Sequence, residues 1–194
     1  LAALVAVPAV AAAGAESQYA RRRLPALRLS APPTIDGDLA DAVWKEAARA
    51  DTFIDRERGH VAEDQTTAWI GYDDQAIYVA FHCRDSRPDG IVARETVRYS
   101  KYQTDEQSED SVEVFFDPFL TRRGDDLASF SVNPLGTPSA RIGGGRATKA
   151  EWKGDWDAKA RRVPDGWTAE MRIPWRILNY RASRDAVTFG INFL

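Results

Sequence analysis

The sequence predicts an all-β protein: an antiparallel β-sandwich, jelly-roll-like, with one or two short helices. Seven short runs of β-branched and aromatic residues recur along the chain, turn-forming residues separate them, and only two segments have a helical pattern. A chain of 194 residues, 44% of them hydrophobic, is enough for one domain with one core. A closed barrel is the rival architecture for the same strand pattern.

The expected strands are bounded by Asp, Asn, Gly and Pro residues that favour turns. They span residues 66–72, 76–83, 111–116, 128–132, 158–163, 168–173 and 187–193. In the third run, the alternation of a strand puts Val112, Val114 and Phe116 on one face, which should be the core face.

Two short helices complete the prediction. One should run from about Leu39 to Ala48, because Asp38 can cap its start and apolar residues follow at four-residue spacing. The other is a single turn after Pro174, at about 175–178.

The N-terminal segment of the sequence suggests an exported protein. Residues 1–15 are apolar, Ala-rich and end in an A-x-A-like site, which predicts a signal peptide truncated at its N-terminus; a membrane anchor or a buried helix is the alternative. Residues 16–33, with three prolines, should form an extended lead-in, and residues 34–194 the sandwich, truncated at its C-terminus. Periplasm, outer membrane or cell surface is the expected location.

Composition argues against several functions. The formal charge of -3 is spread along the chain, so nothing suggests a nucleic-acid partner. Cys83 is the only cysteine, which excludes an internal disulfide, and its apolar surroundings predict a buried structural thiol rather than a nucleophile. The two histidines belong to no catalytic motif, and we expect no enzyme activity from this chain.

Acidic residues cluster between Asp105 and Asp117, which raises the question of a glycosidase pair. Glu113 and Asp117 share a strand face but lie about 13 Å apart at the rise of a strand. Glycoside hydrolysis needs roughly 5 to 9.5 Å, so the spacing argues against catalysis. A solvated acidic edge or a calcium site remains open for this cluster.

Several motifs in order resemble family 9 carbohydrate-binding modules. They are Ile35-Asp36-Gly37 with Trp44, the hairpin at 73–80, Asp110-Ser111-Val112-Glu113, Asn133-Pro134-Leu135-Gly136, and residues 166–175. The last two look most like a subgroup at the N-terminus of larger bacterial proteins whose remaining length is predicted to form an outer-membrane β-barrel. The similarity covers roughly residues 30 to 194.

The resemblance implies a set of sugar-binding positions. In sugar-binding members two Trp rings clamp a sugar, while a Glu, an Arg and amide groups bond its hydroxyls. Glu113 matches the binding Glu, Gln107 stands in place of the first Trp, and Ser131 stands in place of the Arg. The second Trp would lie beyond Leu194. The family also often carries structural calcium, for which Asp105 and Asp110 are the candidate ligands.

Two tryptophans could replace the missing aromatic platform. Trp152 and Trp156 lie in a polar segment, where they offer a stacking face or else cap the edge of the sandwich. The leading hypothesis is a non-catalytic glycan-binding module of an exported bacterial protein, which could target an attached glycoside hydrolase in carbohydrate catabolism. The alternative is an interaction domain attached to an outer-membrane β-barrel, with its sugar site lost.

Overall fold

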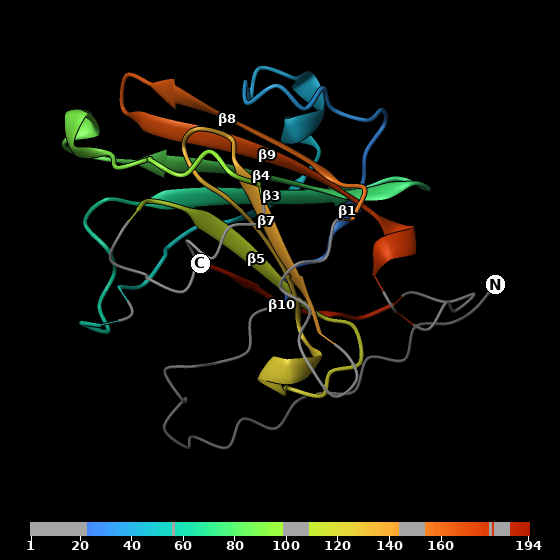
Figure 1. Ribbon diagram of the computed structural model, residues 1–194. Helices are drawn as coiled ribbons and strands as arrows, with labels where there is room; N and C mark the ends of the chain where they lie inside the picture. The colour runs from blue at the N-terminus through green and yellow to red at the C-terminus, as the bar shows by residue number, and fades with distance from the viewer. Residues whose placement is uncertain (1–22, 56, 99–108, 144–153, 179, 181–186) are drawn as a thin grey trace, which may run out of the picture.

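The computed structural model describes residues 23–55, 57–98, 109–143, 154–178, 180 and 187–194. Two β-sheets face each other, which confirms the predicted sandwich (Figure 1). The first sheet has the strand order β1-β3-β4-β9-β8, with β2 paired to β3. The second has the order β10-β5-β6-β7. All the pairs are antiparallel except that of β1 with β3.

The strands of the first sheet are β1 (Leu27–Arg28), β2 (Ala48–Ala50), β3 (Thr66–Tyr72), β4 (Ala76–Arg84), β8 (Asp157–Val163) and β9 (Gly166–Pro174). Those of the second are β5 (Val112–Asp117), β6 (Ala128–Val132), β7 (Pro138–Ile142) and β10 (Gly190–Phe193). The helical segments are single 3-10 turns: η1 (Ala42–Lys45), η2 (Pro88–Gly90), η4 (Gly124–Asp126) and η5 (Trp175–Ile177).

The core lies between the two sheets. The predicted inward face of β5 is confirmed, because Val112, Val114 and Phe116 are all buried. The side chains that meet them come from both sheets and include Phe81, Phe130, Trp167 and Met171. Aromatic side chains of the two sheets also pack against each other. The centroid of the Phe193 ring, on β10, lies 5.8 Å from that of the Phe81 ring, in an edge-to-face arrangement. This burial is the main stabilising contribution to the fold.

A second, smaller apolar cluster covers the other face of the first sheet. Tyr78 and Ala80 point away from the core between the sheets and pack against the N-terminal segment, whose buried side chains are Leu29 and Trp44. In Figure 1 this segment, in blue, lies over the first sheet on the side away from the second. The molecule therefore has a third layer made of irregular chain.

The predicted helix at 39–48 is wrong. Only the 3-10 turn η1 forms, and Asp38 does not cap it, because its carboxylate faces Ala40 N and Arg161. The chain must become a strand at Ala48 to pair with β3, which leaves no room for a ten-residue helix. The predicted turn after Pro174 is confirmed as η5.

The described part of the lead-in is extended but belongs to the fold. β1 pairs in parallel with β3, and Arg28 forms a two-pronged ion pair with Asp74 at 2.7 and 2.5 Å. Leu29 follows and is buried against Gly71, at which a Cβ atom would come within 2.5 Å of the Leu29 side chain. The folded unit therefore begins before residue 34.

Candidate functional site

The outer face of the second sheet carries two rows of polar and aromatic side chains. Since the inward residues of β5 form the core, the alternate residues point the other way. One row, the Glu113 row, runs from Glu113 through Ser131 to Ser139, and the strand register sets these three side by side. The other, the Phe115 row, runs from Asn192 through Phe115 and Ser129 to Arg141.

Glu113 is the residue of the Glu113 row that a ligand can reach. Its side chain is half-buried, while its backbone N–H and carbonyl are both bonded to Leu194, at 2.8 and 2.9 Å. The pairing holds Glu113 in a regular ladder position, so its side-chain direction is fixed by the sheet. A carboxylate on such a face accepts hydrogen bonds from two neighbouring hydroxyls.

Ser131 is fully buried, and its hydroxyl donates to the carbonyl of Ser139 at 3.3 Å. The position that the resemblance matches to the family's Arg therefore holds a small residue whose hydroxyl takes part in the sheet. It offers no long, planar donor to a sugar, unlike the guanidinium it replaces.

Trp156 does not offer the stacking face that the sequence suggests. Its side chain is 1% exposed, and its ring lies 5.2 Å from that of Phe130 in the core between the sheets. The residue directly precedes β8, so its side chain turns inward where the strand begins. Gln107, Trp152 and Asp105 lie outside the described residues.

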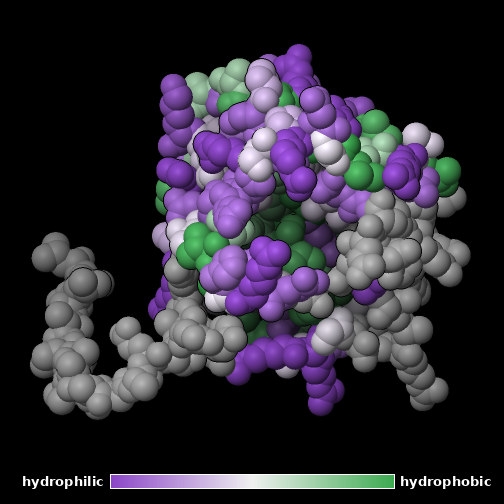
Figure 2. All heavy atoms as spheres, turned by 90° about the vertical axis from the view of Figure 1, so that its left-hand side faces the viewer, coloured by the Kyte–Doolittle hydropathy of each residue, from purple (hydrophilic) through white to green (hydrophobic). Residues whose placement is uncertain are grey.

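Asp110 lies at one end of the sandwich, beside a cavity of about 310 Å³ that is also lined by Asp64, Asp85 and Trp167. Figure 2 shows this end of the molecule, where hydrophobic atoms are visible in a depression with a mostly hydrophilic rim. The Asp110 carboxylate accepts a hydrogen bond from Val92 N at 2.6 Å. Within the described residues, no three His, Cys, Asp or Glu side chains form a group that could hold a metal ion. The described residues therefore do not build the calcium site for which Asp110 is a candidate ligand.

Cys83 lines the same cavity and is buried, as predicted. Burial raises the pKa of its thiol to about 12. The thiol therefore stays protonated at neutral pH and is a poor nucleophile.

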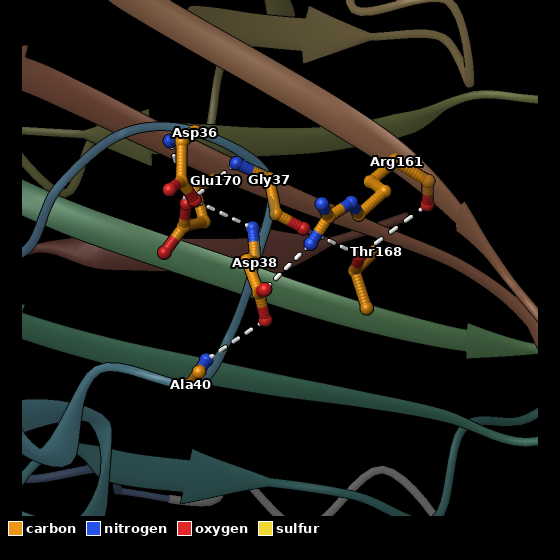
Figure 3. A network of polar contacts seen from close by, with 7 residues as sticks. All are labelled: Asp36, Gly37, Asp38, Ala40, Arg161, Thr168 and Glu170. Carbon is orange, nitrogen blue, oxygen red and sulfur yellow. Dashed lines mark hydrogen bonds and ion pairs between the residues drawn. The ribbon is translucent and has the colours of Figure 1, made fainter.

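Glu170 is a buried acid that the sequence did not single out. It is fully buried under the Ile35-Asp36-Gly37 turn (Figure 3), where its Oε2 accepts from Asp36 N and Gly37 N at 3.0 and 2.8 Å. Its Oε1 accepts from Trp44 Nε1 at 2.8 Å. Both oxygens are occupied by the chain itself, so this carboxylate fixes the third layer to β9 and is not available to a ligand.

The described residues contain no helix long and apolar enough to cross a membrane. The fold is a two-sheet sandwich with a short-helix N-terminal layer, and its outward-pointing polar rows lie on one sheet face. These features define the fold class: a two-sheet β-sandwich with a polar outer sheet face.

Comparison with known proteins places the chain within that class. Residues 35–194 match the model of the carbohydrate family 9 binding domain-like family, and the chain belongs to this family. No curated protein sequence matches it.

Solved structures confirm the fold. A family 9 carbohydrate-binding module from Caldicellulosiruptor kristjanssonii, in complex with cellotriose, is similar with a TM-score of 0.57 and 21% identity over 87% of this chain and 74% of that one. A structure of that organism's module with glucose gives the same TM-score. A putative carbohydrate-binding protein from Bacteroides uniformis reaches 0.64 at 13% identity, over 87% and 80% of the chains.

Proposed function

We propose that this chain is a non-catalytic module that binds a glycan on the outer face of its second sheet. The observation that carries the proposal is the position of Glu113, half-buried on that face at the place of the family's binding Glu. Solved relatives of the fold hold cellotriose and glucose, which supports sugars as the ligand class. The module would belong to an exported protein and would concentrate that protein on glycan. A glycoside hydrolase attached to the module would gain from this targeting, because it would be held close to its substrate.

The test is isothermal titration of the 194-residue chain with a panel of uncharged and acidic polysaccharides and short cello-oligosaccharides. Glu113→Gln should weaken binding at least tenfold, because loss of one charge-assisted hydrogen bond costs about 1.5 to 3 kcal/mol. Glu63→Gln, at an exposed loop position, is the matched control and should bind as the parent does. A folded chain that binds none of the panel would refute the proposal.

A second function has its own observation in its favour. Ser131 is buried where the family's Arg would reach the sugar, and Trp156 belongs to the core, so two elements of a sugar clamp are missing from the surface. This favours an interaction domain that kept the sandwich, attached to an outer-membrane β-barrel. Saturable sugar binding that Glu113→Gln abolishes would exclude it.

A further inference from the structure

The Phe115 row contains a cation without a counter-ion. Arg141 lies on the edge strand β7 with its side chain half-buried, and within the described residues its guanidinium has neither a hydrogen bond nor an ion pair. The other half-buried arginine of the described residues, Arg172, differs in having an ion-pair partner, Asp157. The five donors of this guanidinium are therefore left to acceptors other than the described residues.

The residue beside Arg141 is also unsatisfied. Ser129 faces Arg141 across the β6–β7 ladder. The residue is 1% exposed, and its buried hydroxyl has no hydrogen-bond partner among the residues that the structure describes. Buried polar atoms without partners are rare in native proteins and cost about 1 to 3 kcal/mol each. Two neighbouring donors thus lack acceptors at one place on the sheet.

The same row supplies an aromatic ring and an amide. Phe115 faces Ser129 from the other side and is half-buried, and Asn192 beyond it is exposed. Two strand spacings separate Phe115 from Arg141, which is roughly 10 Å between Cα atoms. A sugar ring lying on the Phe115 side chain would have its substituents within reach of the long Arg141 side chain.

We propose that the Phe115 row selects acidic glycans, with Arg141 pairing the carboxylate of a uronic acid residue whose ring lies over Phe115. The proposal rests on the glycan-binding function above and names the substrate class of that face. A planar guanidinium matches the two oxygens of a carboxylate in a two-pronged pair. Asn192 would bond ring hydroxyls at the other end of the row.

The charge on Glu113 is compatible with this assignment. Glu113 lies two strands and two residues from Arg141, roughly 12 Å between Cα atoms, so it does not neutralise the guanidinium directly. Asp117, two residues along the strand on the other side, is buried, and its oxygens accept from Thr121 N and Arg122 N at 3.0 and 2.7 Å. Within the described residues of β5, then, neither carboxylate on the outward face pairs with Arg141.

The experiment compares three polymers on the 194-residue chain: a polyuronate, a sulfated glucan and an uncharged glucan. Arg141→Gln should weaken polyuronate binding about tenfold or more and leave binding of the uncharged glucan unchanged, since only the charged pair is lost. Arg141→Lys keeps the charge but lacks the planar guanidinium, so its affinity for the polyuronate should lie between those of the parent and Arg141→Gln. Arg123→Gln, which removes an exposed charge from a turn, is the matched control and should bind like the parent.

The outcomes separate this inference from the function it rests on. If the uncharged glucan binds through Glu113 while the polyuronate binds no tighter, or if Arg141→Gln weakens both equally, the acidic-glycan inference fails and glycan binding stands. A preference for the sulfated glucan, or an equal loss in Arg123→Gln, also overturns it by pointing to non-specific charge. If no polymer binds the folded chain, the glycan-binding function itself fails.

Discussion

At the scale of single residues, Glu170 is the side chain on which the N-terminal layer depends most. Glu170→Ala would leave the backbone N–H groups of Asp36 and Gly37 and the indole N–H of Trp44 without their acceptor. We expect the free energy of unfolding to fall by roughly 2 to 4 kcal/mol, measured by urea denaturation. The matched control is Asp38→Asn, which weakens only the exposed ion pair to Arg161 and should cost about 1 kcal/mol or less.

The titration of Glu170 gives a second prediction. Burial raises the pKa of this carboxyl above its ordinary value, although three hydrogen bonds oppose the shift. Because the pKa is raised in the folded state, the contribution of Glu170 to the free energy of unfolding is complete below the unfolded-state pKa. This contribution declines as pH rises through the folded-state pKa. The stability difference between the parent and Glu170→Ala should therefore shrink as pH rises across that interval. A difference that grew with pH in urea titrations would contradict this assignment.

At the scale of elements, the turn after β5 is held in a strained form by Asp117. Leu120 and Arg122 both have left-handed backbone conformations, with φ of 55° and 59°. Such a conformation costs a non-glycine residue about 1 to 2 kcal/mol. Arg122→Gly should thus be neutral or stabilising by up to about 1 kcal/mol, after the entropy that glycine loses on folding.

The neighbouring Arg123 provides the matched control for that prediction. It is equally exposed but extended, with φ of -104°, so glycine there brings only the entropic cost of about 0.5 to 1 kcal/mol. The two substitutions remove the same charge, yet only Arg123→Gly should lower the melting temperature. Equal destabilisation by both would show that the left-handed turn does not form in solution.

The elements that could be predicted from the sequence are those whose pattern is local. β3 and β6 match their expected ranges: β-branched and aromatic residues dominate β3, apolar and small polar residues alternate in β6, and turn residues follow both strands. β7 was missed because Pro138-Ser139-Ala140-Arg141-Ile142 has little strand propensity; as an edge strand, it depends on pairing with β6 and tolerates a proline at its first position.

The candidate site was harder to predict for the same reason. Glu113 could be placed by its motif and by the alternation of its strand. The Phe115 row could not, since it needs the register of four strands, one of them unrecognised. The inward turn of Trp156 depends on the packing of the core between the sheets, which no spacing in the sequence shows.

At the scale of the whole molecule, the N-terminal layer is part of the cooperative fold rather than a tether. Leu29 packs where Gly71 has no side chain, and an added Cβ would meet Leu29 Cδ2 at 2.5 Å and Cγ at 2.7 Å. Gly71→Ala should therefore destabilise the parent, by roughly 1 to 3 kcal/mol, because the Leu29 side chain must move out of its place.

A double-mutant cycle tests whether that contact exists in solution. Leu29→Ala alone should cost roughly 2 to 3 kcal/mol for the lost burial, and it also removes the side chain that Gly71→Ala displaces. In the Leu29→Ala background, Gly71→Ala should then cost about 1 kcal/mol or less. The interaction free energy of the two substitutions would therefore clearly exceed the near-zero value expected for independent sites. Additive costs in urea denaturation would mean that residues before 34 are detached from β3, and the folded unit would then begin at the Ile35-Asp36-Gly37 turn.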